Sequence, residues 1–375
     1  MSWDNVIGQQ RIKGLLRSMF ESGRIPHAML FHGPAGVGKD AAALTFARAL
    51  NCAEGKFEPC GSCPSCQAME SLRHQRLKLI FPMPSKADED SAVDKLSEDE
   101  LGEMNAQIDA KAENPYHHIS MAKAAGIKIS SVRDIRRESA FRSGTSGRTV
   151  VLISDADRMN SSAANALLKT LEEPSGDLLL ILTSARKDTL LPTIISRCQL
   201  LRFDVLAEEQ ILTALKRLPD VPLEVAGAAA QLSGGSYGLA LQMAREGGLI
   251  RREDVLTYLR AVVKYNPQNL MERIQAILAL EEKETLIRFL VAVASWFRDV
   301  LAVQEGAGDR MLNTDFREPI TKFAEHYPDA DCSRALDEIE RCVDLVQKNV
   351  HLVNMMIVLS QRLRRCITPA ESVIL

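Results

Sequence analysis

One stretch near the N-terminus has the residue types and the spacing of a phosphate-binding loop. It follows the apolar run 28–32, precedes a predicted helix at 39–50, and consists of Gly33, Pro34, Ala35, Gly36, Val37, Gly38, Lys39 and Asp40. The order matches G-x-x-x-x-G-K, in which small residues let backbone N–H groups turn toward a phosphate. The dipole of the following helix and the charge of Lys39 add to this attraction. The stretch therefore predicts a nucleotide site, with a plain glycine-rich turn as the alternative.

The residue after the lysine departs from that pattern. A Ser or Thr normally offers its hydroxyl to Mg²⁺ at this position, where the chain has Asp40. A carboxylate is longer and negative, so its repulsion of a triphosphate should weaken nucleotide binding or change its metal dependence. We expect ATP with Mg²⁺ to bind weakly or not at all, although the retained Lys39 leaves nucleotide binding open.

A second acidic segment, Ser154-Asp155-Ala156-Asp157, follows the apolar strand predicted at 150–153. ATPases of this kind usually place an Asp here for Mg²⁺ and a Glu for the attacking water. In one register Ser154 stands at the metal position and Asp155 replaces the Glu; in the other, Asp155 holds the metal and Ala156 replaces the Glu. A carboxylate shortened by a methylene misplaces the water. Both registers lose a group, so we predict slow or absent hydrolysis.

A cluster of cysteines predicts a metal site. Its members are Cys52, Cys60, Cys63 and Cys66. Four thiolates can close a tetrahedral zinc site and leave no open position, so the Zn²⁺ should be structural. His74 is an unnecessary fifth candidate. The remaining four of the eight cysteines are scattered and are interpreted as small buried residues: Cys198, Cys332, Cys342 and Cys366.

These residues need a sheet to position them. Apolar runs at 28–32, 150–153 and 178–182 alternate with helical segments, which predicts a parallel sheet covered on both faces. Beyond Asp204 the pattern is helical, with apolar residues at the spacing of a bundle core, as in 286–300. We predict three domains: an α/β domain at 1–205, a small helical lid at 206–248 and an all-α domain at 249–375.

Composition sets further limits. The chain has 375 residues, 46% of them apolar, and a net charge of −3, which excludes a chain-wide basic field for nucleic acid. An apolar run of membrane-spanning length and a secretory signal are both lacking, so we expect a cytoplasmic protein. The acidic segment 86–113 is predicted to be a solvated or disordered insertion. A basic stretch could contact DNA phosphates or form a solvated helix face: Lys128, Arg133, Arg136, Arg137, Arg142 and Arg148.

Five features in one order resemble the bacterial sliding-clamp loaders of the DNA polymerase III holoenzyme. They are Ile7-Gly8-Gln9, His27-Ala28, the phosphate loop, NALLKTLEEP at 165–174, and Ser196-Arg197-Cys198. The resemblance covers about residues 1–245. It implies a RecA-like AAA+ domain with a zinc module, a helical lid, and an all-α collar that joins subunits into a pentameric ring. It also implies gamma/tau and delta subunits as partners, with the sliding clamp and primed DNA.

The same resemblance assigns individual roles. Arg197 is expected to act in trans as an arginine finger in a neighbouring gamma subunit, with an ordinary surface arginine as the alternative. Gly238 stands where the hydrolysing subunit keeps a phosphate-binding Arg. Together with Asp40 and Ser154, this favours a subunit that hydrolyses little or no ATP. A divergent ATP-hydrolysing gamma/tau subunit and an AAA+ adaptor outside replication remain as alternatives.

Overall fold

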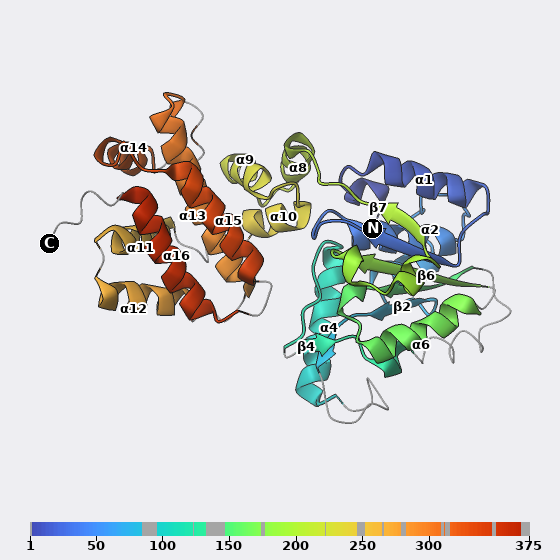
Figure 1. Cartoon of the computed structure of the whole chain (residues 1–375). Coiled ribbons are helices and arrows are strands. Elements are labelled where there is room, and N and C mark those ends of the chain that lie inside the picture. Colours follow the sequence, from blue (N-terminus) through green and yellow to red (C-terminus); the bar gives the residue numbers. More distant parts are fainter. Residues whose placement is uncertain are drawn as a thin grey trace. The chain divides into compact units, whose positions relative to one another are not determined.

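The computed structural model describes most of the chain. The residues described are 2–84, 96–122, 124–132, 147–173, 177–221, 223–245, 252–264, 266–278, 283–308, 311, 316–346 and 350–368. They fall into two compact units (Figure 1). The first comprises Met1–Leu218 with Ser233–Leu241, and the second comprises Pro219–Leu232 with Gln242–Leu375.

The first unit is built on a five-stranded parallel sheet with strand order β2-β5-β6-β1-β7. The strands are β1 (Ala28–His32), β2 (Leu77–Ile80), β5 (Thr149–Ile153), β6 (Leu178–Ser184) and β7 (Gln199–Arg202). The three strands predicted from apolar runs are confirmed as β1, β5 and β6. They carry no polar alternation because both of their faces are buried.

Alternate residues of these strands enter two separate cores, one on each face of the sheet. On one face Met29 and Phe31 pack with α1 (Gln10–Glu21) and α2 (Lys39–Asn51). On the other, Leu30 packs with α6 (Ser161–Glu172) and α7 (Pro192–Ile195). Asn160 is the N-cap of α6, because its side chain accepts a hydrogen bond from the Ala163 N–H.

Other elements of this unit surround the sheet. The helices are α3 (Pro64–Glu70), α4 (Glu98–Glu113), α8 (Glu208–Leu215) and the start of α10 (Tyr237–Arg245). The short strands β3 (Met83–Pro84) and β4 (Ala124–Gly126) pair antiparallel. Single 3₁₀ turns lie at η1 (Trp3–Asn5), η2 (Ala156–Arg158) and η3 (Lys187–Thr189).

The helix α4 corrects the prediction of a solvated or disordered insertion at 86–113. The Ser97 side chain accepts from the Glu100 N–H, and the Glu100 carboxylate accepts from the Ser97 N–H, which forms a capping box. Three of the acidic residues that suggested disorder, Glu98, Asp99 and Glu100, lie in the first turn of α4, where they interact favourably with the helix dipole. Ile108 and Ala112 pack against the core of the first unit. The rest of the segment, up to residue 95, lies outside the described residues.

The second unit is helical. It contains α9 (Leu223–Leu232), α11 (Arg252–Lys264), α12 (Pro267–Leu278), α13 (Lys283–Gln304), α14 (Arg317–His326), α15 (Cys332–Val346) and α16 (Leu352–Ile367). The apolar stripe predicted at 286–300 is confirmed as core, and Cys332, Cys342 and Cys366 are buried there as predicted. The helices expected to form a lid divide between the units, since α8 belongs to the first and α9 to the second. A separate lid domain at 206–248 remains a prediction. None of the described helices is long and apolar enough to cross a membrane.

Candidate functional site

The phosphate loop joins β1 to α2, as predicted. Gly33, Gly36 and Gly38 have positive φ angles of 144°, 71° and 101°. Glycine is the residue that adopts this backbone readily. The Lys39 Nζ donates to the carbonyl oxygens of Gly33 and Pro34, each at 2.6 Å. Burial lowers the pKa of Lys39, although the carboxylates of Asp40 and the segment after β5 oppose this. The lysine is thus held against its own loop.

Asp40 is the centre of a polar network at the start of α2. One carboxylate oxygen, Oδ1, accepts from the Thr183 hydroxyl of β6 at 2.7 Å. The other, Oδ2, accepts from the Ser154 hydroxyl at 2.9 Å and lies 2.8 Å from the Nζ of Lys111 in α4. Both oxygens of Asp40 are therefore engaged by side chains from three other elements.

The charge of Asp40 is stabilised by this network. Burial by itself would raise the pKa of Asp40, but the Lys111 ammonium and the hydrogen bonds from Lys111, Thr183 and Ser154 lower it to about 2. The Asp40 side chain is 21% exposed and that of Lys111 only 3%. The pair is an ionised carboxylate and ammonium held largely away from water.

The structure distinguishes the two registers of the second acidic segment. Ser154, at the end of β5, bonds to Asp40 of the loop, so Ser154 occupies the position facing the loop. Asp155 has a left-handed backbone, with φ of 51°, and its Oδ2 lies 2.7 Å from the Nε2 of His118. That bond raises the pKa of His118. In this geometry the group facing the loop is a hydroxyl, and the carboxylate that follows is held by a histidine.

Three residues of this site were not predicted from the sequence. Lys111 lies in an acidic segment and His118 in a loop, and neither belongs to a recognisable motif. Thr183 lies within an apolar strand, where it could have been noted as a polar residue at the strand end. The roles of the loop residues 33–40 and Asp155 in nucleotide binding remain predictions.

The start of α10 packs directly on the tip of the loop. The Gly238 N–H donates to the Gly36 carbonyl at 2.9 Å, and a Cβ added at Gly238 would lie 3.1 Å from the Gly36 Cα. The ring of Tyr237 packs edge-on against Tyr116 with centroids 4.7 Å apart. The Tyr116 hydroxyl accepts from the Ile7 N–H at 2.8 Å. The small size of Gly238 therefore permits this close approach, and its correspondence to a sensor arginine remains a prediction.

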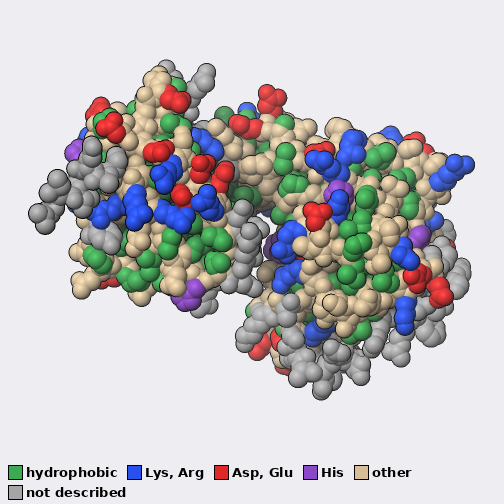
Figure 2. All heavy atoms as spheres, viewed as in Figure 1, with side chains coloured by type: hydrophobic (Ala, Val, Ile, Leu, Met, Phe, Trp, Pro, Cys, Tyr) green, Lys and Arg blue, Asp and Glu red, His purple; other side chains and the backbone are tan. Residues whose placement is uncertain are grey.

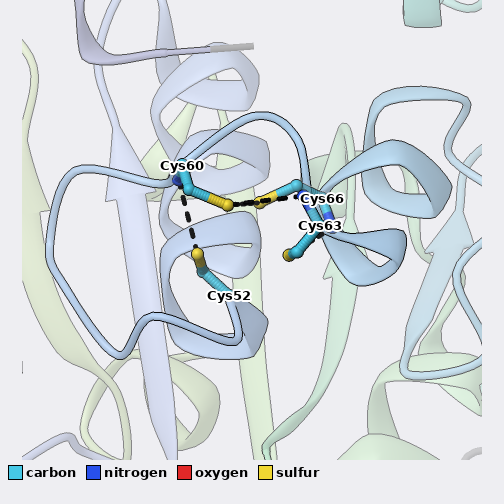
Figure 3. Close-up of side chains that lie close together, drawn as sticks. All are labelled: Cys52, Cys60, Cys63 and Cys66. Carbon is cyan, nitrogen blue, oxygen red and sulfur yellow. Dashed lines mark hydrogen bonds between the residues drawn. The ribbon is translucent and has the colours of Figure 1, made fainter.

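The four clustered cysteines converge, as predicted (Figure 3). Their Sγ atoms all lie within 4.8 Å of one another, and those of Cys60 and Cys66 are 3.9 Å apart. A tetrahedral zinc with bonds of about 2.3 Å requires sulfur separations of about 3.8 Å, so this set fits the metal. N–H groups of Cys60, Cys63 and Cys66 each donate to a sulfur of the cluster at 3.4 Å, which favours thiolates.

Residues near this cluster have separate partners. The Nε2 of His74 lies 3.0 Å from the Ser65 hydroxyl, and its Nδ1 accepts from the Arg76 N–H. His74 thus has hydrogen-bond partners outside the cluster, and its absence from the ligand set remains a prediction. The position of Cys63 before α3 gives it a second role, because its sulfur caps the first turn of that helix.

Arg197 lies on the surface between α7 and β7. Its guanidinium donates to the Thr193 carbonyl at 3.1 Å and lies 2.9 Å from a carboxylate oxygen of Glu172. The Arg197 side chain is 38% exposed. The next residue, Cys198, is partly buried against the core, which matches the pattern of a surface arginine before an inward cysteine.

The structure describes only part of the predicted basic stretch. Arg133, Arg136, Arg137 and Arg142 lie outside the described residues. Arg148 donates to the Ile25 carbonyl at 3.4 Å. Basic and acidic side chains are interspersed on the face shown in Figure 2. A DNA-binding role of this stretch remains a prediction.

A parallel sheet covered on both faces, with a phosphate loop after β1 and helices in the C-terminal part of the chain, defines the AAA+ fold class that was expected. Comparison with known proteins agrees. Residues 8–207 match the family model described as "DNA polymerase III, delta subunit", and residues 247–368 match "DNA polymerase III, delta subunit, C terminal".

Individual relatives identify the subunit type. The chain is 30% identical to DNA polymerase III subunit delta' of Bacillus subtilis over 84% of each chain. It is 27% identical to subunit tau of the same organism, over 70% of this chain and 38% of tau. A solved DNA polymerase III gamma subunit-related protein of Thermotoga maritima is 14% identical, with a TM-score of 0.42, over 95% of this chain and 99% of that one. The chain belongs to the delta-prime family of DNA polymerase III clamp-loader subunits, which serve DNA replication.

Proposed function

We propose that this subunit supports ATP-driven loading of the sliding clamp onto primed DNA without hydrolysing ATP itself. In this proposal it joins delta and gamma/tau subunits in a hetero-pentameric ring through its C-terminal helices. Arg197 then completes the ATP site of a neighbouring gamma/tau subunit. Cytoplasmic placement follows from replication and stays a prediction.

The network at Asp40 supports the absence of hydrolysis. The hydroxyl that would bind Mg²⁺ is replaced by a carboxylate, and the group facing it after β5 is Ser154. The site lacks the metal hydroxyl, the metal carboxylate in its expected place, and the sensor arginine at Gly238. Each loss removes a positioned group from phosphoryl transfer, where catalysis depends on positioning and charge stabilisation. An ATP-hydrolysing gamma/tau identity is therefore the less favoured function.

The surface position of Arg197 supports its role in trans. Its bonds are to Thr193 and Glu172, neither of which belongs to the phosphate loop of this chain. The bond to Glu172 is a solvent-exposed ion pair, which costs on the order of 0–1 kcal/mol to break. The guanidinium can therefore leave it for a γ-phosphate, where it stabilises charge in the transition state.

Steady-state ATPase and clamp-loading rates of the reconstituted complex test this role. Arg197→Ala should lower the turnover of the ATP site that it completes by about 10³-fold or more. Because other sites remain, total ATPase should fall in part while clamp loading falls strongly. Arg202→Ala is the matched control, since Arg202 is 74% exposed and pairs with Asp204. Equal loading rates for the Arg197→Ala complex and the wild-type complex, with intact assembly, would refute the role.

We also propose that the four-cysteine cluster holds a structural Zn²⁺. The convergence of Cys52, Cys60, Cys63 and Cys66 supports this, and a full set of sulfur ligands leaves no place for a reacting water. Elemental analysis of the purified chain should find about one zinc per chain, and Cys60→Ser should lower that content and the thermal stability together. The assignment would be contradicted if the purified wild-type chain held no zinc and Cys60→Ser left its thermal stability unchanged.

A further inference from the structure

The ammonium of Lys111 occupies a complete cation site. Its Nζ lies 2.8 Å from the Asp40 carboxylate, 2.7 Å from the His117 carbonyl oxygen and 3.4 Å from the Pro115 carbonyl oxygen. An ammonium has three donors, and three acceptors surround this one. The Lys111 side chain is 3% exposed, so the site is built into the protein interior.

The ligands of this cation are those that a hard divalent metal would use. A carboxylate and backbone carbonyls are typical oxygen ligands of Mg²⁺ and Mn²⁺. The carboxylate comes from Asp40, the position that gives a hydroxyl to Mg²⁺ in other phosphate loops. The second metal position of a phosphate-loop site is also changed. Ser154 faces Asp40 from the place where an aspartate normally holds the metal.

With Lys111 in place, the charges at the site disfavour binding of a divalent metal ion. Asp40 is neutralised by Lys111, and both of its oxygens already accept hydrogen bonds from Ser154 and Thr183. A divalent ion at this place would have to displace a buried ammonium or bind beside it, against the repulsion of like charges. The residues present therefore do not fit Mg²⁺.

We propose that Lys111 is an internal replacement for the divalent cation of the phosphate loop. The proposal deepens, and in that respect rests on, the proposed lack of ATP hydrolysis by this chain. The ammonium fixes the loop to α4 and closes the loop to Mg²⁺. The acidic segment thus has a structural role, because its helix α4 carries Lys111, the cation that pairs with the Asp40 carboxylate.

Removing the ammonium should open a metal site. In Lys111→Met the Asp40 carboxylate and the carbonyls of Pro115 and His117 remain, with no positive charge among them. Lys111→Gln is a second variant that keeps a hydrogen-bond donor in case the methionine variant does not fold. Asp40→Asn/Lys111→Met is the matched control, because it removes both charges and should hold no metal.

Binding of Mn²⁺ to the purified full-length chain, measured by electron paramagnetic resonance, tests the proposal. Lys111→Met or Lys111→Gln should bind one Mn²⁺ at least roughly tenfold more tightly than the wild-type chain does. Mn²⁺ should raise the melting temperature of these single variants and not that of the wild-type chain. The double variant should behave like wild type.

Two results would overturn the proposal. One is a folded Lys111 variant whose affinity for Mn²⁺ equals that of the wild-type chain, and the other is an equal gain in affinity in the double variant. These readouts do not involve Arg197 or the assembled loader. A failure here is therefore distinct from a failure of the proposed function, which is measured by clamp loading and by ATP turnover.

Discussion

Replacing Lys111 by methionine should destabilise the first unit at neutral pH by about 2 kcal/mol. The network lowers the pKa of Asp40 from 3.8 to about 2. At about 1.4 kcal/mol for each pKa unit, this difference corresponds to about 2 kcal/mol of preferential stabilisation of the carboxylate. Asp40 is 21% exposed, so water recovers part of the loss. Breaking a fully buried pair would cost more, roughly 3–5 kcal/mol.

The direction of the Asp40 pKa shift determines how the destabilisation by Lys111→Met should change with pH. In the wild-type chain the pKa of Asp40 is depressed, so its contribution to stability is present above about pH 4 and lost as the pH falls toward about 2. Without Lys111, we expect burial, already the largest single influence, to outweigh the remaining hydrogen bonds from Thr183 and Ser154 and to raise the pKa of Asp40. The deficit of the variant should then be largest near about pH 8 and shrink as the pH falls and the carboxyl takes up a proton.

Urea unfolding followed by the fluorescence of Trp3 provides the assay. A Trp296→Phe background removes the other tryptophan, so that the signal reports the unit that holds the loop. Arg73→Met is the control, because Arg73 pairs with Asp109 of the same helix α4 but both side chains are more than half exposed, at 61% and 56%. That pair should contribute no more than about 1 kcal/mol. A Lys111→Met deficit as small as the control, or one that does not change with pH, would refute the reasoning.

Other predictions concern the elements around this pair. Ser97→Ala removes the side-chain half of the α4 capping box and should cost about 1 kcal/mol in the same assay; an unchanged unfolding midpoint would contradict it. Gly36→Ala places a Cβ 2.1 Å from the Ser236 hydroxyl at a φ of 71°, so amide hydrogen exchange at the start of α10 should become faster, and unchanged protection would argue against the contact. The hydrogen bond to Asp155 raises the pKa of His118, so this pair stabilises the folded chain below about pH 6.5. The stabilisation is lost as the pH rises through the raised pKa. The stability deficit of His118→Gln should therefore shrink between about pH 6 and about pH 9.

The sheet and its loop could be predicted because their signals are local. The apolar runs that form β1, β5 and β6 have no polar alternation, and this follows from burial on both faces. The loop glycines and Lys39 are adjacent in sequence and act as one backbone unit. The same is true of the cysteine cluster, since fifteen residues (52 to 66) contain all of its sulfur atoms. Short spacing determines these sites before tertiary packing does.

The partner of Asp40 could not be predicted, because nothing local specifies it. Lys111 is 71 positions away in a segment whose acidic composition favours solvent exposure. Capping and acidic first-turn residues make that segment a helix, and packing of Ile108 and Ala112 then turns its last turn toward the loop. The composition of a segment reports its average environment, whereas a single buried lysine depends on one long-range contact. A carboxylate at position 40 was the available signal that some cation had to lie nearby.

The departures at Asp40 and Ser154 and the retention of the loop have a common structural explanation. The loop is held by Lys111 through Asp40 on one side and by α10 through Gly36 on the other. It also ends β1, which pairs along its length with β7, the strand that begins just after Arg197. We expect a loop fixed by protein side chains to keep this edge of the sheet in one arrangement whether or not nucleotide and metal are bound. Under the proposed role of Arg197 in trans, a constant arrangement of this edge is an advantage, whereas a hydrolysing subunit has to change with its nucleotide. Under the proposed function, the Asp40–Lys111 pair is therefore a replacement for nucleotide-dependent ordering and not merely a damaged catalytic site.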